Sequence, residues 1–236
     1  MRRLTISLVL ALFAITALSA QDLDKILNDH YKASAQDKLS KITSTSMIGK
    51  SVAMGMETAL AFYMSRPNNL RIDINVAGSK IIQTYNGTTG WLYAPLMGVT
   101  EAREMTEDEL KTVVNQANMD SPLWDYKARG NSVELIGTTE DGSAHMIKLI
   151  TAGGDKMTIC ISKETSLVSK VITTQMAQGM ETEIEIEFKD YKVIKGIPTA
   201  HYMGTKMGGQ VVSAVTFESI EYNKTLDSSL FGKPVI

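Results

Sequence analysis

Residues 65–94 carry an uninterrupted series of strand and turn signals. Between residues 70 and 76 apolar and polar side chains alternate, so one face of a strand is apolar: Leu70, Ile72, Ile74 and Val76. Pro67 lacks the N–H that strand pairing requires, so it marks the start of this strand. Asn86-Gly87 is a strong signal for a hairpin turn, and the short strand 91–94 follows it. This order predicts consecutive antiparallel hairpins.

The same pattern continues along most of the chain. Further strands are expected at 41–48 and 54–65, joined by a turn near Gly49-Lys50. Others are expected at 80–85 and, after residue 130, at 132–138, 144–151, 156–162, 167–176, 180–189, 198–206 and 210–222. Short strands at regular spacing, separated by glycine-containing turns, are typical of an antiparallel meander. A sheet of about ten strands curls, and its concave apolar face then needs a cover.

Two amphipathic segments are available to cover such a sheet. The first spans 22–38, and the second spans 106–124, where Thr106 and Glu109 match the capping box of a helix start. Curved sheets under helices commonly enclose ligand cavities. The predicted fold class is therefore α+β, a single curved antiparallel sheet with α-helices as a lid over an apolar cavity. An ordinary helix docked on a sheet would give the same residue pattern.

The first 20 residues have the pattern of a cleavable signal peptide, with Arg2 and Arg3 before the apolar stretch Leu4–Leu18. This stretch is short for a membrane span, although an uncleaved anchor is the alternative. No cysteine is present near the cleavage site to carry a lipid. We therefore expect export and release, with residues 21–236 forming one domain.

Charge and reactive side chains argue against several classes of function. Without the two leader arginines, 24 basic residues become 22 against 26 acidic ones, and the net charge moves from −2 to −4. Nucleic-acid binding requires a basic surface and is not expected. His30, His145 and His201 lie far apart in no metal or triad motif, and Cys160 is the only cysteine. We expect neither an enzyme nor a bound metal or other cofactor.

Methionine is unusually frequent for a chain with few aromatic residues. The sequence has 14 Met against 5 Phe. A thioether side chain is flexible and polarizable, so it suits a cavity that must open, close and accept irregular apolar chains. The filling of ordinary gaps in a hydrophobic core is an equally good explanation for any single methionine.

The segment 65–97 resembles the LolA-type periplasmic carriers of bacterial lipoproteins. That family typically has an Arg-Pro, then a hairpin that ends in Trp-x-Tyr-x-Pro, and here these are Arg66-Pro67, Trp91-Leu92-Tyr93 and Pro95. The C-terminal segment 230–234 is also typical of related chains. The resemblance implies an incomplete β-barrel in a monomeric periplasmic protein. It also implies that acylated lipoproteins are the cargo, taken from an inner-membrane lipoprotein-releasing transporter to an outer-membrane acceptor.

The resemblance also implies roles for individual residues. Arg66 corresponds to the arginine that closes the lid, because its five donors can bond several lid carbonyls at once; an arginine that only shapes a strand start is the alternative. The candidate ligand-binding residues are Ile72, Ile74, Trp91 and Tyr93 in the wall, and Leu110, Val113, Val114, Leu123 and Trp124 in the lid. For each of these apolar residues the alternative is a place in the ordinary core.

Two other functions are compatible with the same residues. A periplasmic binding or sensor protein of this fold would need the same apolar cavity. A carrier of another lipid or apolar cargo would need it as well. The sequence does not distinguish between these cargos, and it identifies neither donor nor acceptor.

Overall fold

The computed structural model describes residues 22–235 apart from 54, 178 and 179, so the predicted signal peptide lies outside the described residues. The chain separates into two compact units. Of the described residues, unit 1 comprises 22–35 and 122–185, and unit 2 comprises 36–121 and 186–235. Each unit has a hydrophobic cluster of its own. That residues 21–236 act as one domain stays a prediction.

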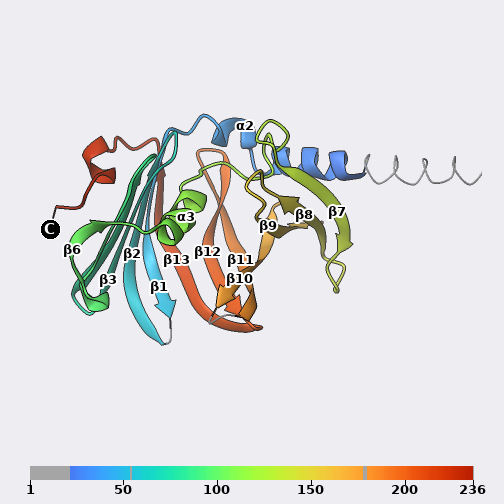
Figure 1. The fold of residues 1–236 in the computed structure, drawn as a ribbon. Helices are drawn as coiled ribbons and strands as arrows, with labels where there is room; N and C mark the ends of the chain where they lie inside the picture. Colours follow the sequence, from blue (N-terminus) through green and yellow to red (C-terminus); the bar gives the residue numbers. More distant parts are fainter. Residues whose placement is uncertain (1–21, 54, 178–179, 236) are drawn as a thin grey trace, which may run out of the picture. The chain divides into compact units, whose positions relative to one another are not determined.

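Unit 2 is built mainly from antiparallel strands (Figure 1). Its strands are β1 (Ser44–Ala53), β2 (Met56–Ser65), β3 (Asn69–Val76), β4 (Ser79–Asn86), β5 (Gly90–Ala94), β6 (Val99–Glu104), β12 (Ile197–Met207) and β13 (Gln210–Tyr222). Consecutive strands from β1 to β6 pair with one another, and β13 pairs with both β1 and β12. The helical elements are α2 (Gln36–Leu39), α3 (Glu107–Gln116), and the 3-10 turns η1 (Pro95–Met97) and η2 (Ser228–Phe231).

Unit 1 combines one helix with a smaller set of strands. The helix covers residues 22–33. The strands are β7 (Ser132–Thr138), β8 (Ala144–Ile150), β9 (Lys156–Ser162) and β10 (Val168–Ala177). Each pairs in antiparallel fashion with its successor from β7 to β10. Strand β11 (Met180–Ile194) begins in unit 1 and ends in unit 2.

All 13 strands belong to one sheet, in the hydrogen-bonded order β6-β5-β4-β3-β2-β1-β13-β12-β11-β10-β9-β8-β7. Every pair whose register is described is antiparallel. The order begins at β6 and ends at β7, so among the described residues the sheet is not closed. The prediction of a single antiparallel sheet is confirmed. The lid and the apolar cavity stay predictions.

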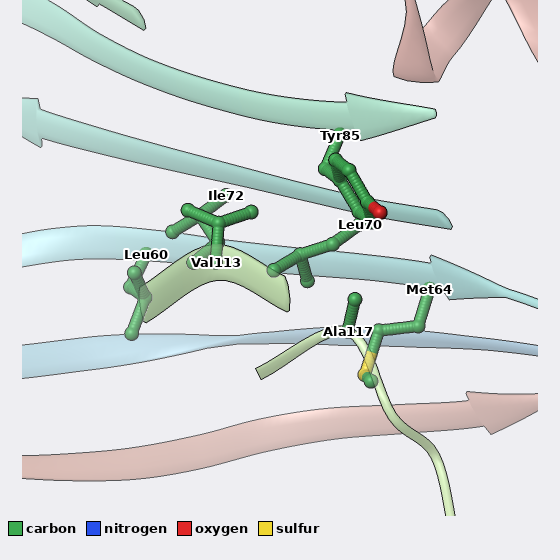
Figure 2. Packing of buried hydrophobic residues seen from close by; sticks show 7 residues of the cluster. All are labelled: Leu60, Met64, Leu70, Ile72, Tyr85, Val113 and Ala117. Atoms are coloured by element: carbon green, nitrogen blue, oxygen red, sulfur yellow. The ribbon is translucent and has the colours of Figure 1, made fainter. Parts of the chain in front are cut away.

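The core of unit 2 forms between one face of β2–β4 and the α3 segment. Side chains from the strands meet two from α3 and its C-cap (Figure 2): Leu60, Met64, Leu70, Ile72, Tyr85, Val113 and Ala117. Full burial of each large aliphatic side chain contributes about 1.5–3 kcal/mol. The alternation in β3 produces this core directly, since Leu70 and Ile72 face it while Arg71 and Asp73 point to the other side of the sheet.

The core of unit 1 forms between the helix 22–33 and strands β8 and β9. Leu27 from the helix is buried with Leu123 and with four strand residues: Ile147, Leu149, Ile159 and Ile161. The apolar residues of the helix recur at helical spacing, so they share one face. That face packs on the strands, as the sequence pattern predicts.

The first hairpin differs from its prediction. The pattern predicts a turn near Gly49-Lys50, but β1 continues to Ala53. The register with β13 shifts between Ile48 and Gly49, which marks a bulge. At Gly49 the backbone of β13 approaches so closely that a Cβ would collide with the carbonyl oxygen of Thr216. This glycine therefore permits a close backbone contact rather than a turn.

Two further elements differ from the predicted boundaries. The helix predicted over 22–38 stops at 33, where a turn with Ala35 at φ 49° separates it from α2. The strand β6 was not predicted, because in Val99–Glu104 only Ala102 is buried and the segment lacks an apolar face. Its pairing with β5 supplies the backbone partners that make it a strand.

Candidate functional site

Arg66 follows directly after the last residue of β2, and its guanidinium group reaches two separate segments of unit 2. Its Nε donates to the carbonyl oxygen of Ile42 at 2.6 Å, and its Nη2 donates to that of Leu39 at 3.1 Å. The two terminal nitrogens also bond both carboxylate oxygens of Asp120, each at 2.6 Å. A planar guanidinium suits this arrangement, because it presents its donors in a fixed fork.

The Arg66–Asp120 pair is mostly removed from solvent. The side chain of Arg66 is 25% exposed and that of Asp120 is 11% exposed. The hydrogen bonds to Asp120 raise the pKa of Arg66, so this guanidinium stays charged. Gln36 adds a weaker bond from its Nε2 to Asp120 at 3.4 Å. These contacts join the start of unit 2, the end of β2 and the segment after α3.

The α3 segment places its apolar side over the core of unit 2. Its capping box is confirmed, because Thr106 accepts from the backbone N–H of Glu109 and the Glu109 side chain accepts from that of Thr106. Val113 is buried in the core cluster and Leu110 packs against it. Val114 is 39% exposed and does not belong to that cluster. Of the three residues predicted on this helix, two therefore face the sheet.

The register separates the predicted wall residues onto two faces of the sheet. Ile72 is buried in the core under α3, and Ile74 packs against the same cluster. Trp91 pairs with Thr84, which pairs with Arg71, so these side chains lie on the opposite face. On that face the C-terminal segment contacts the strands.

Two hydrogen bonds fix this C-terminal segment. Thr84 donates to the carbonyl oxygen of Gly232 at 2.9 Å, and Arg71 donates to that of Leu230 at 3.3 Å. Tyr93 pairs with Ile82 and therefore shares the face of Trp91. A wall beneath α3 is consistent with Ile72 and Ile74, whereas Trp91 and Tyr93 belong to the face that η2 contacts.

The remaining predicted lid residues belong to unit 1. Leu123 is fully buried in the core of that unit, and its carbonyl oxygen accepts a hydrogen bond from the hydroxyl of Tyr31 at 2.5 Å. Trp124 is half-buried and stacks edge-to-face with Tyr31, with ring centroids 5.1 Å apart. The structure thus places the predicted residues in both units.

Asp120 and Gln36 are the site residues that sequence reasoning missed. Asp120 lies in a short segment that was predicted only as an apolar continuation of the second helix. One signal in the sequence does indicate this residue, since a carboxylate lies within that otherwise apolar stretch. A charge that is buried needs a partner of opposite sign. Arg66 is separated from Asp120 by 54 residues, so no local pattern connects them.

Within the described part of the chain, no group of three or more His, Cys, Asp or Glu residues is arranged to hold a metal ion. The free thiol of Cys160 is buried, and this burial raises its pKa. Across the same described residues, no helix is both long and apolar enough to cross a membrane.

Neither a protein-family model nor a curated protein matches this sequence. Solved structures do match it. A DUF1329 family protein from Desulfovibrio piger has a TM-score of 0.59 at 13% identity, over 86% of this chain and 95% of that one. An outer membrane lipoprotein-sorting protein domain from Vibrio parahaemolyticus has a TM-score of 0.59 at 11% identity, over 89% of this chain and 97% of that one.

A LolA superfamily protein from Nitrosomonas europaea is similar to the same extent. Its TM-score is 0.58 at 11% identity, over 89% of this chain and 97% of the other. The chain has a LolA-like fold. The resemblance that rests on Arg66-Pro67 and the hairpin after it is thereby confirmed at the level of fold. At these identities the LolA-like fold carries no activity with it, so the function depends on the site itself.

Proposed function

We propose that this LolA-like chain is a periplasmic carrier that binds the acyl chains of lipoproteins and transfers them from the inner to the outer membrane. The observation that carries the proposal is the set of bonds made by Arg66. They hold the segment after α3 to the end of β2 and to the start of unit 2, and Met119 in that segment packs against the apolar core on the sheet. A reversible latch of this kind is what a carrier needs to admit and release cargo.

The physical reason for a carrier is the cost of exposing acyl chains to water. Each exposed CH₂ costs about 0.8 kcal/mol, so three chains of roughly 16 carbons cost on the order of 30–40 kcal/mol. Such a cargo crosses water only inside an apolar container. Opening that container need cost only a few kcal/mol, which partners can supply by binding the open state better.

The side chains around the unit 2 core suit an irregular apolar ligand. Four methionines belong to the cluster or pack against it: Met47, Met64, Met105 and Met119. Their flexible side chains can repack when α3 moves away from the strands. The proposed acyl site therefore lies between α3 and the face that carries Ile72 and Ile74.

The remaining parts of the proposal follow from the predicted signal peptide and the fold. The carrier would be exported to the periplasm and work there as a monomer, without a cofactor or a catalytic step. An inner-membrane lipoprotein-releasing transporter would supply the acylated lipoprotein, and an outer-membrane acceptor would take it.

The test is a release assay with the chain from Gln21 onward. Spheroplasts that display a newly made outer-membrane lipoprotein are incubated with the protein, and the soluble fraction is examined for a complex. We expect release by the unmodified chain. Arg66→Leu removes all four side-chain hydrogen bonds. We expect this variant to load the lipoprotein, and then to retain it or to transfer it at a clearly altered rate. Lys41→Leu, at an exposed position of the neighbouring segment, is the matched control.

Each outcome of this assay has a meaning. Unchanged transfer by Arg66→Leu would remove the latch from the mechanism. No release by a folded protein that still binds an apolar dye would move the cargo to another lipid, or the role to sensing.

A further inference from the structure

Unit 1 contains a pocket of about 420 Å³ that the carrier proposal does not use. One wall is a single face of the helix 22–33, because its four residues follow helical spacing: Asp24, Leu27, Asn28 and Tyr31. The other wall is the consecutive segment Trp124, Asp125, Tyr126 and Lys127. The pocket therefore combines three aromatic rings with two carboxylates and one ammonium group.

The aromatic rings are held in place by specific contacts. Tyr31 and Trp124 meet edge-to-face at 88°, and the Tyr31 hydroxyl donates to the carbonyl oxygen of Leu123. Tyr31 and Tyr126 also pack against the core cluster of unit 1. The contact places the edge of one ring against the face of the other. The electron-rich faces of aromatic rings attract a cation without hydrogen bonds.

One cation already lies against this pocket. The ammonium group of Lys127 sits over the ring of Tyr126, 5.6 Å from its centroid. Lys127 is a residue of the pocket wall, so its side chain acts as an internal occupant of one aromatic face. A ligand cation would have to compete with it, and removal of Lys127 would free that face.

The charge of the pocket points the same way. Asp24 and Asp125 are exposed, and among the described residues their carboxylates form no hydrogen bond or ion pair. Burial raises the pKa of Tyr31 to about 12, and Tyr126, Asp125 and Asp24 add to that rise. The two aspartates therefore make the surroundings of the Tyr31 ring negative, which favours a positive ligand.

We propose that this pocket binds an organic cation with an alkylated ammonium group, of the choline class. A quaternary ammonium is large and weakly hydrated, and aromatic rings with a nearby carboxylate are its usual partners. A metal ion would need several converging oxygen ligands, and the described residues form no such group. A primary ammonium would need hydrogen-bond acceptors on three sides. A zwitterion such as glycine betaine would bring its own carboxylate close to two aspartates.

The inference is independent of the carrier proposal. Every residue of the pocket belongs to unit 1, whereas Arg66 and its partners belong to unit 2. Loss of choline binding would leave the release assay unaffected, and failure of release would leave this pocket in place.

The first experiment compares choline with 3,3-dimethylbutan-1-ol, which has the same shape but no charge. Binding to the chain from residue 21 onward is followed by calorimetry and by tryptophan fluorescence. In a Trp91→Phe background, Trp124 is the only remaining tryptophan and reports on the pocket alone. We expect saturable quenching by choline and binding at least about tenfold tighter than for the neutral alcohol. Equal binding of the two compounds, or equal binding of ethanolamine and choline, would overturn the proposal.

Variants then assign the binding to the pocket. Asp24→Asn and Asp125→Asn should each weaken choline binding severalfold, and Asn tolerates the positive φ of 52° at position 125. Lys127→Met should strengthen it, because the competing ammonium is gone. Asp29→Asn is the matched control: it makes the same change on the same helix, outside the pocket lining. Circular dichroism confirms that each variant is folded. Weakening by Asp29→Asn equal to that by Asp24→Asn would contradict a site in this pocket.

A last comparison separates the two sources of the choline group. Dihexanoylphosphatidylcholine, kept below its micelle concentration, carries the same head group on a lipid. If this lipid binds more tightly than choline, and Asp125→Asn weakens the binding of both compounds, the ligand is a lipid head group. If the aspartate variant weakens choline binding alone, the ligand is the free cation. If neither compound binds, the proposal is wrong.

Discussion

Arg66 bonds two kinds of acceptor at once, and these differ in what they contribute. The carbonyl oxygens of Leu39 and Ile42 position the side chain, while the carboxylate of Asp120 neutralises it. A half-buried guanidinium without that carboxylate would keep two donors without a charged acceptor. We therefore expect the proposed latch to depend most on Asp120, although only Arg66 follows from the family resemblance.

The first prediction concerns this pair. Asp120→Asn should destabilise unit 2 by about 2 kcal/mol, because a hydrogen bond to a charged group contributes roughly 1.5–3 kcal/mol. Arg66→Lys should cost a similar amount, since an ammonium group cannot bond both carboxylate oxygens and two carbonyls. The measurement is urea unfolding, with Asp37→Asn on α2 as the control. The double variant Arg66→Leu, Asp120→Asn should cost clearly less than the sum of the costs of Arg66→Leu and Asp120→Asn, each measured singly. Strict additivity would show that the two side chains do not act together.

The second prediction concerns His30, which is buried in unit 1. Its Nδ1 donates to the carbonyl oxygen of Ser166 at 2.9 Å, and its Nε2 is buried with no hydrogen-bond partner. Burial lowers the pKa of His30 in the folded state, so the unfolded chain binds the proton more readily. The stabilising effect of neutral His30 is therefore fully present above the unfolded pKa of about 6.5, and is lost as the pH falls below it.

This effect can be measured with one conservative change. In His30→Asn, the side-chain amide can still donate to Ser166 but does not titrate. We expect the fall in unfolding free energy between pH 7 and pH 5 to be smaller in this variant than in the unmodified protein. The pH profile of His30→Asn is compared with that of His145→Asn. Burial lowers the pKa of His145 as well, although that histidine is less buried. An identical pH profile for His30→Asn and the unmodified protein would contradict the assignment.

At the scale of elements, α3 shows how a local signal controls a long-range contact. Thr106 and Glu109 fix the start of this helix through the capping box. Arg103 in β6 donates two hydrogen bonds of 2.8 Å to the carboxylate of Glu109. The hydrogen bonds from Arg103 and the backbone of Thr106 lower the pKa of Glu109 to about 2, so its charge persists at any physiological pH. The far end of the helix leads to Asp120.

The third prediction follows from that arrangement. Thr106→Ala should destabilise α3 by about 1 kcal/mol, since it removes the acceptor for a backbone N–H in the first turn. Hydrogen exchange of the α3 amides should become faster, while β8 and β9 in unit 1 remain unchanged. Thr100→Ala, at an exposed position of β6, serves as the control. If α3 exchange were unaltered, the capping box would not limit the opening of this helix.

The elements that the sequence predicts correctly are those with local causes. The capping box depends on two residues three apart, and β3 and β13 have boundaries close to those that alternation predicts. The pattern assigns Gly49 to a turn, but the structure needs a glycine there because β13 approaches closely. That strand lies far away in the sequence, so no local signal indicates the contact. The segment 91–93 is apolar at three consecutive positions, so alternation could not assign Trp91 to a face. The pattern misses Asp120 because only a distant partner, Arg66, explains it, whereas it misses β6 because that segment lacks an apolar face.

At the scale of the whole molecule, one sheet of 13 strands supports two separate hydrophobic cores. The two cores differ in character. The unit 1 cluster is dominated by Leu and Ile, whereas the unit 2 cluster has four methionines in it or packed against it. Branched aliphatic residues pack into well-defined arrangements, and methionine adapts to several. A mobile apolar cargo is therefore expected to enter unit 2 and to leave unit 1 unchanged.

The fourth prediction tests this division with a simple ligand. A 16-carbon fatty acid, kept below its aggregation concentration and at about 100 times its Kd, should stabilise the protein by about 2.7 kcal/mol. For a chain of this length that corresponds to a rise in Tm of roughly 5–10 °C. Hydrogen exchange should show slower exchange in α3, β2 and β3, with no change in β8 and β9. Filling the site with Ile72→Trp should abolish both effects, whereas Ile147→Val in unit 1 should lower the overall stability without affecting the ligand. Protection confined to β8 and β9 would place the apolar site in unit 1, and the latch at Arg66 would then have no role in holding cargo.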